Sequence, residues 1–178
     1  LVKAINLSNS TYGSLQVKDT AQVVSVGNNA IDNLAAGSVS VLSGTVSASD
    51  IAINNTGTGT ISTSGGSVTS SNNIAVNNTG TLNVSGGNVT SSNNIGINNT
   101  SAGKVTVSGG TITARNVAIN SNSSGAISIS KGDIKSTGDM AIKNTGSGSV
   151  SISDANIDAV KDAINISGSG NLQVTGDS

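Results

Sequence analysis

A short phrase of apolar, small and polar residues recurs along the whole chain at an almost constant interval. Typical copies are IAINN at Ile51 and IAVNN at Ile74, in which a small residue lies between two aliphatic residues and Asn follows. The small residues that anchor the eight copies are Ala4, Ala30, Ala52, Ala75, Gly96, Ala118, Ala141 and Ala163. The steps between them are 26, 22, 23, 21, 22, 23 and 22 residues, a spacing typical of one solenoid coil.

Within each coil, apolar and polar residues alternate in three short stretches, which predicts three strands per coil. In the coil over 50–71 the expected inward residues are Ile51 and Ile53, then Ile61 and Thr63, then Val68. The second strand recurs as Leu15/Val17, Val39/Val41, Leu82/Val84, Val105/Val107, Ile127/Ile129, Val150/Ile152 and Leu172/Val174, and the third as Val23, Val46, Val89, Ile112, Ile134 and Ile157. Clusters such as Asn-Thr-Gly and Ser-Gly-Gly separate the strands and predict turns.

The way in which these strands pair follows from the turn chemistry. The chain contains no Asn-Gly or Asp-Gly dipeptide, so the tight turns of an antiparallel meander are not indicated. No apolar stripe with a 3.6-residue period lasts more than a turn, which argues against helices. We therefore expect a single all-β domain over 1–178, a three-sided parallel β-helix of about eight coils of about 22 residues, with the right-handed winding that parallel crossovers favour.

Three columns of Asn and Asp accompany the apolar columns. One precedes the first strand, at Asn28, Asp50, Asn73, Asn94, Asn116 and Asp139. A second follows the inward Ile, at Asn6, Asp32, Asn54, Asn77, Asn98, Asn120 and Asn165, and a third lies at the corner, at Asn33, Asn55, Asn78, Asn99 and Asn144. Stacked amides can bond along the rod and satisfy turn backbone, so we interpret these columns as structural ladders, with an exposed ligand-binding ladder as the alternative.

The small residue between the two aliphatic positions of each phrase is expected to face outward. A flat face of Ala and Asn is then the candidate contact surface, formed by Ala52, Ala75, Gly96, Ala118, Asn54, Asn77 and Asn98. No charged residue occurs in 51–103, so this surface is uncharged in the middle of the chain. Farther along, Lys135 is expected to stack on Asp158, and Asp139 on Lys161, because each pair occupies equivalent columns.

Composition removes most catalytic chemistry. The chain has no His or Cys, and Asp accounts for all of its acidic residues, so catalytic triads built on His, zinc sites and thiol chemistry are not available. Its densest carboxylates are Asp154, Asp158 and Asp162, with lysines nearby that can neutralise them. Thr-x-Thr, the motif of an ice-binding array, is complete only at Thr111 and Thr113 on the third strand. We expect no enzyme activity, no cofactor and no metal.

Charge and hydropathy restrict the partners. The formal net charge is −1, so the chain lacks the basic surface that nucleic acid requires. No apolar run approaches 18 residues, and we expect no membrane contact by this segment. The remaining candidates are a cell-surface glycan or protein, and end-to-end association of the chain with itself.

The repeats "IAINNTGTGTISTSGGSVTSSNN" and "IAVNNTGTLNVSGGNVTSSNN" resemble those of bacterial surface β-helix proteins, such as autotransporter passengers and cell-wall adhesins. The resemblance implies export, an extracellular or cell-surface location, and a role as a rigid stalk or adhesive segment of a longer protein. The catalytic Asp and Arg clusters of pectin-degrading β-helix enzymes have no counterpart here. Two alternatives stay open: a subunit of a self-assembling fibre, and a protein that binds or degrades polysaccharide.

Overall fold

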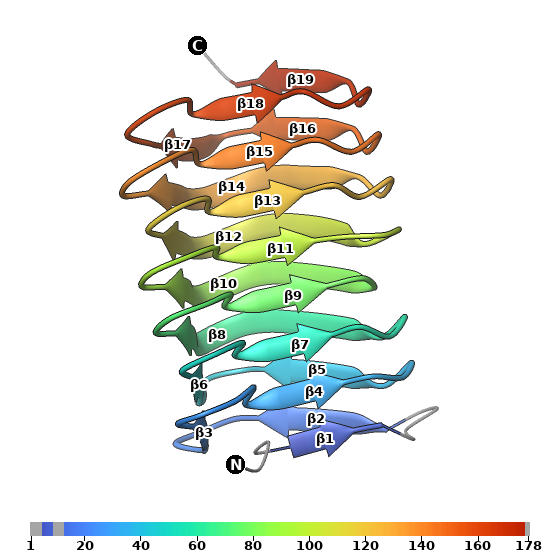
Figure 1. Ribbon diagram of the computed structural model, residues 1–178, viewed down its shortest axis with the longest axis vertical. Helices are drawn as coiled ribbons and strands as arrows, with labels where there is room; N and C mark the ends of the chain where they lie inside the picture. Colours follow the sequence, from blue (N-terminus) through green and yellow to red (C-terminus); the bar gives the residue numbers. More distant parts are fainter. Residues whose placement is uncertain (1–4, 9–12, 177–178) are drawn as a thin grey trace.

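The chain folds into a stack of parallel coils (Figure 1). The structure, a computed structural model, describes residues 5–8 and 13–176, and these residues form strands and turns without any helix. Ala4 and Tyr12 lie outside the described residues. Every strand pairs in parallel with the equivalent strand of an adjacent coil, as in Ile53↔Val76 and Asn54↔Asn77. The predicted parallel β-solenoid of about eight coils is confirmed.

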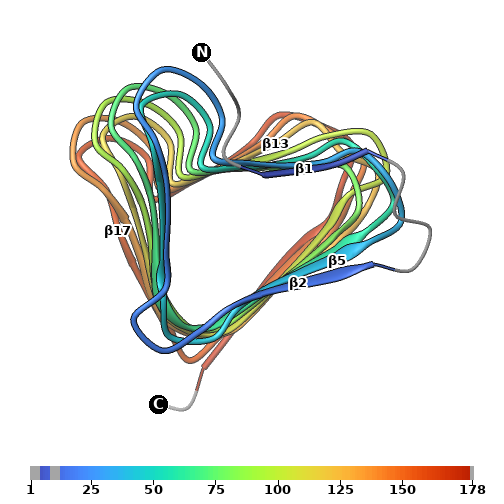
Figure 2. The same ribbon diagram turned by 90° about the horizontal axis from the view of Figure 1, so that it is seen from below.

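Seen along its axis, the stack is three-sided (Figure 2). The first face is an eight-stranded sheet with one three-residue strand per coil. Its strands are β1 (Ile5–Leu7), β4 (Ile31–Asn33), β7 (Ile53–Asn55), β9 (Val76–Asn78), β11 (Ile97–Asn99), β13 (Ile119–Ser121), β15 (Ile142–Asn144) and β18 (Ile164–Ile166). Adjacent strands align Ile or Val of one coil with Ile or Val of the next.

The second and third faces belong to one continuous sheet that bends at a corner. In the middle coils a single strand covers both faces: β8 (Thr60–Ser70), β10 (Thr81–Ser91), β12 (Lys104–Ala114) and β14 (Ile127–Ser136). Elsewhere the second face has β2 (Ser14–Val17), β5 (Ser38–Val41), β16 (Val150–Ser153) and β19 (Leu172–Thr175), and the third face has β3 (Gln22–Ser25), β6 (Thr45–Ala48) and β17 (Ala155–Asp158). Each coil thus has three sides, but the middle coils do not have three separate strands.

Glycines with positive φ make this bend possible inside a strand. Gly66, Gly87, Gly110 and Gly132 have φ values of 69°, 76°, 80° and 109°. Residues with a side chain rarely adopt such angles, whereas Gly adopts them without steric cost. The Ser-Gly-Gly clusters, predicted as turns between strands, are therefore bends within β8, β10 and β12.

The coils wind in the right-handed sense. In Figure 1 the chain follows the first face from left to right at the front, returns along the second face at the back, and rises from the N-terminal to the C-terminal end. Seen from below in Figure 2, the same path runs clockwise away from the viewer. Parallel crossover connections strongly favour this hand in β-sheets.

The core consists of the predicted aliphatic columns. Ile53, Ile61, Val68 and Thr63 of one coil are at most 1% exposed. Their equivalents in the coils between Val39 and Ile142 are buried in the same way, and together they form one continuous cluster. Ile51 differs from the prediction, since it is only half-buried and precedes β7. The alternation of the first face therefore begins at Ile53, two residues later than the sequence pattern indicated.

Candidate functional site

The Asn column at the end of the first-face strands is a buried hydrogen-bonded chain, which we call the inner ladder. Asn33, Asn55, Asn78 and Asn99 are 0% exposed. The Nδ2 of each donates to the Oδ1 of the next, at 2.9, 3.0 and 2.9 Å. Buried amides need such partners, because leaving one unsatisfied costs about 1–3 kcal/mol. The predicted structural ladder is confirmed at these four positions.

The inner ladder also closes the corner between the first and second faces. The second N–H of each amide donates to a glycine carbonyl farther along its own turn: Asn33 to Gly37 at 2.8 Å, Asn55 to Gly59 at 3.0 Å and Asn99 to Gly103 at 2.7 Å. The glycines of this corner also lie in close contact from coil to coil, since a Cβ added at Gly59 would lie 2.0 Å from the Gly37 oxygen. A buried amide and a residue without a side chain thus act together at this corner.

Two serines continue the column where an Asn is missing, and the sequence pattern did not identify them. Ser121 Oγ lies 3.4 Å from Asn99 Nδ2, and Ser123 Oγ donates to the Gly103 oxygen at 2.7 Å. Both serines are at most 1% exposed. Asn144, predicted as a ladder member, instead bonds within its own turn, to Gly148 O at 2.7 Å and Gly146 N at 3.2 Å. Ser121 follows Asn99 at the repeat spacing of about 22 residues, and this spacing could have identified it as a member of the column.

The neighbouring column forms the outer ladder, which consists of Asp32, Asn54, Asn77, Asn98 and Asn120 on the outer side of the first face. The Nδ2 of Asn54 donates to Asp32 Oδ1 at 2.8 Å, and the three following amides donate to the preceding one at 2.9 Å each. The four Asn side chains are half-buried, whereas Asp32 is 0% exposed. The predicted structural role of Asn54, Asn77, Asn98 and Asn120 therefore has a direct geometric basis.

Asn165 occupies the predicted column but does not belong to the outer ladder. Lys143 lies between Asn120 and Asn165 in the register of the first face. Asn165 Nδ2 instead donates to Asp162 Oδ2 at 3.0 Å. The prediction for Asn165 is therefore wrong, because a lysine cannot accept the amide proton that would continue the ladder.

A third column, the corner ladder, consists of Asp50, Asn73, Asn94 and Asn116 between the third and first faces. Its amides donate toward the N-terminal end at 2.6, 3.0 and 3.2 Å. Buried Ser70, Ser91 and Ser136 support this corner, since each Oγ accepts the backbone N–H three residues later at 2.9–3.0 Å. The corner is therefore held by side chains as well as by backbone pairing.

The predicted outward face of small residues is wrong. Ala52, Ala75 and Ala118 are 0% exposed, and Gly96 is also buried. A Cβ on Gly96 would contact Ile112 Cγ2 at 3.1 Å, so the column points into the core. These residues lie at a bend before the first-face strand, where strict alternation has not begun and the interior has space only for a small side chain. Of the predicted contact face, only Asn54, Asn77 and Asn98 reach the surface.

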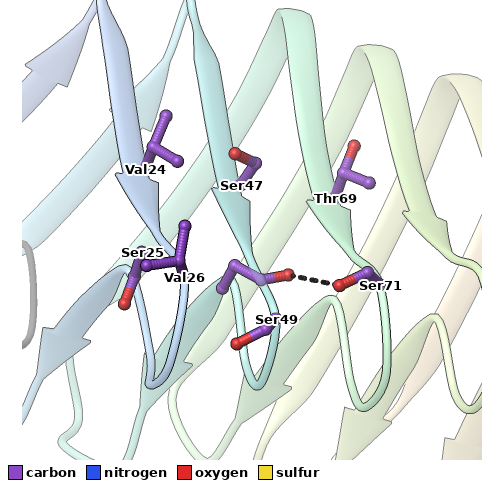
Figure 3. A pocket seen from close by; sticks show the side chains of 8 residues that line it. Val24, Ser25, Val26, Ser47, Ser49, Thr69 and Ser71 are labelled. Atoms are coloured by element: carbon purple, nitrogen blue, oxygen red, sulfur yellow. Dashed lines mark hydrogen bonds between the residues drawn. The ribbon is translucent and has the colours of Figure 1, made fainter. Parts of the chain in front are cut away.

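A shallow pocket lies on the third face beside this bend (Figure 3). Its volume is about 300 Å³, and it is lined by Val24, Ser25, Val26, Ser47, Ala48, Ser49, Thr69 and Ser71. Val24 and Val26 are 51% and 83% exposed. The equivalents of Val24 in the next two coils are Ser47 and Thr69, so the apolar surface is confined to one coil. No titratable side chain lines the pocket, and it therefore offers no acid, base or charged anchor.

The predicted charge pairs form across adjacent coils. Lys135 Nζ lies 2.6 Å from Asp158 Oδ2, and Lys161 Nζ lies 3.0 Å from Asp139 Oδ1. The hydrogen bond from Lys135 to Asp158, helped by the charge attraction, raises the pKa of Lys135 above its ordinary value. Both partners are about half exposed, so the pair contributes little to stability. Of the three densest carboxylates, Asp158 and Asp162 are therefore bonded to Lys135 and Asn165.

Within residues 5–8 and 13–176, no three acidic side chains gather in a way that could hold a metal ion. The same residues contain no helix that could cross a membrane. Comparison of the chain with family models, curated proteins and solved structures gave no match.

Proposed function

We propose that this chain is a rigid, non-catalytic segment of an exported bacterial surface protein, serving as a stalk or an adhesive surface. The observation that carries the proposal is the inner ladder with its glycine column. From Asn33 to Asn99 it links the corner of one coil to the corner of the next through buried amides and backbone oxygens. Coils joined in this way resist bending and sliding, because any displacement exposes unsatisfied buried groups.

The shape of the molecule also supports a stalk. Parallel strands lie about 4.8 Å apart, so eight coils extend about 38 Å along the axis. Each coil contacts only its neighbours, so the length can grow by repetition without a larger core. A structure of this kind separates two points in space and needs no reactive group.

The outer ladder is the surface best suited to an adhesive role. Asn54, Asn77 and Asn98 place one half-buried amide on each coil, within a stretch that has no charged residue. Each of these amides uses one N–H along the ladder and retains one for a partner. An uncharged glycan or a polar protein surface offers the matching hydroxyls and carbonyls, so the proposed extracellular partner belongs to these classes.

Mechanical pulling tests the stalk. The chain has no native Cys, so the exposed Ser14 and Thr175 can be replaced by Cys as unique handles near the two ends. We expect no extension at low force, followed by steps that each release one or a few coils of about 22 residues. Continuous extension from the lowest force would contradict a rigid stalk.

Binding and turnover assays separate the alternatives. The intact chain is applied to a glycan array and incubated with plant and microbial polysaccharides, and released reducing sugar is measured. Binding without turnover supports an adhesive segment, and neither result leaves a stalk alone. Release of reducing sugar that increases with protein concentration would contradict a non-catalytic role.

A further inference from the structure

The three ladders differ in direction. In the inner ladder each Nδ2 donates toward the C-terminal end, as from Asn33 to Asn55. In the outer ladder each Nδ2 donates toward the N-terminal end, as from Asn54 to Asp32. Adjacent residues of one strand, Asn54 and Asn55, therefore carry amides that point in opposite directions along the rod.

The inner ladder has a local reason for its direction. Each amide must direct one N–H at the glycine carbonyl of its own turn, for example Asn55 at Gly59. Only the nitrogen can make that bond, so the oxygen is left to accept from the preceding coil. Every rung is fixed by its own backbone, independently of the ends.

The outer ladder has no such support at its rungs. The side chains of Asn54, Asn77, Asn98 and Asn120 bond only to the ladder residues before and after them, among the residues that the structure describes. An Asn amide can rotate by half a turn and exchange its donor and acceptor at almost unchanged shape. Either direction would satisfy the interior rungs, and the ends must decide between them.

The two residues that flank the four amides in register carry opposite chemistry. Asp32 Oδ1 accepts from Asn54 at 2.8 Å and is itself held by Asn29 Nδ2 at 2.8 Å. A carboxylate offers acceptors, so it requires the first amide to point its N–H toward the N-terminal end. Lys143 follows Asn120 in register, and an ammonium offers only donors, which suits the oxygen left at that end.

The corner ladder shares only the acceptor on its N-terminal side. Its first donating amide is that of Asn73, whose Nδ2 donates to Asp50 Oδ1 at 2.6 Å. The residue that follows Asn116 in its column is Asp139, which pairs with Lys161 at 3.0 Å. Both flanking residues are carboxylates, but Asp139 is paired with Lys161, whereas Asp50 accepts from an amide of the ladder, and the direction is again toward the N-terminus.

We infer that Asp32 and Lys143 are positioning residues that set the direction of all four amides of the outer ladder. The charges of these two residues match the dipole of the ladder: the negative Asp32 lies at its N–H end and the positive Lys143 at its oxygen end, as favourable charges do at helix ends. The consequence is a polar contact face, on which every coil presents its free N–H and its free oxygen lone pair in the same order. This inference concerns the ladder itself and does not depend on the proposed role of the chain.

The test is to exchange the chemistry of the ends and read the direction by NMR. Scalar couplings across hydrogen bonds identify which Nδ2 donates to which Cγ carbonyl in the isotopically labelled intact chain. The native protein is expected to show couplings from Asn54, Asn77, Asn98 and Asn120 to the preceding ladder residue. In the double variant D32N/K143D the amide at position 32 can donate as well as accept, whereas the carboxylate at position 143 can only accept, so the couplings of Asn54, Asn77 and Asn98 should switch to the following residue.

A folded double variant that retains the native couplings would overturn the inference. If the double variant does not fold, K143D alone keeps Asp32 intact and changes only a half-exposed site. It places an acceptor at both ends, so one native coupling should be lost and a new one should join Asn120 to the introduced carboxylate. Four native couplings without the new one would refute the inference equally. K131D, at an exposed lysine off the ladder, is the matched control and should leave all four unchanged.

Discussion

Replacement of Thr63 by Val should stabilise the protein. Thr63 occupies an inward column of the second face, directly between Val41 and Val84, and is 1% exposed. Its Oγ1 is buried without a hydrogen-bond partner. An unsatisfied buried hydroxyl costs about 1–3 kcal/mol, and Val has nearly the same shape, so the exchange removes that cost without creating a cavity.

The expected gain is about 1–2 kcal/mol in the free energy of unfolding, or about 2–8 °C in Tm for a chain of this length. Urea denaturation followed by circular dichroism measures it. Thr63→Ser retains the hydroxyl but loses a methyl group, and should destabilise by about 1 kcal/mol. Thr60→Val, on the outward side of β8, should change stability by less than about 0.5 kcal/mol. A neutral or destabilising Thr63→Val would refute the assignment of an unsatisfied hydroxyl in the core.

The remaining predictions concern the corners and the charge pair. Asn55→Ala removes bonds of about 3.0 Å to Gly59 O and Asn78 Oδ1, and should lower the free energy of unfolding by about 3–5 kcal/mol in urea denaturation. Asn54→Ala, at a half-buried position, should lower it by about 1 kcal/mol or less. Equal losses would contradict the distinction between the inner and outer ladders. Gly59→Ala should destabilise by about 3 kcal/mol or more, since its Cβ would meet a backbone oxygen at 2.0 Å, while Gly176→Ala, with nothing within 4 Å, should leave Tm unchanged. Because the pKa of Lys135 is raised in the folded state, the ion pair with Asp158 stabilises the fold at neutral pH. This stabilisation is lost as the pH rises above about 10.4, the ordinary lysine pKa, and through the raised pKa of the folded state. Asp158→Asn should lower that pKa in an NMR titration, and an unchanged pKa would show that the pair does not form in solution.

The sequence predicted the solenoid because its period appears in several independent columns. Aliphatic positions such as Ile61 and Val68, the Asn positions and the charges Lys135 and Asp158 all repeat with the same step. In a stack of parallel coils, equal step means direct contact, so register contacts followed from spacing alone. This logic identified both salt bridges correctly.

The orientation of Ala52 could not be derived in the same way. Period-two alternation describes only residues inside a strand, and β7 begins at Ile53. Ala52 precedes it at a bend, where its burial depends on the path of the backbone between two faces. The repeated choice of Ala or Gly at this position was a signal of limited space, but it is equally compatible with a flat outer surface.

The details of the ladders depended on hydrogen bonds that spacing cannot show. Ser121 and Ser123 together replace one Asn: the Ser121 hydroxyl contacts the Asn99 amide, and the Ser123 hydroxyl donates to the Gly103 oxygen. Asn165 has the expected spacing, but Asp162 lies three residues before it and provides the acceptor that Lys143 cannot. Local alternatives of this kind compete with the column and become visible only in three dimensions.

Hydrogen–deuterium exchange resolved by residue tests the central claim, that the coils form one rigid stack joined through the inner ladder. Backbone amides of β7, β9, β11 and β13, together with the Nδ2 protons of Asn55 and Asn78, should exchange slowest and at similar rates. Protection should decrease toward β19, whose residues are exposed. Rapid exchange of the Asn55 and Asn78 side chains, or an abrupt loss of protection between two adjacent middle coils, would contradict the account.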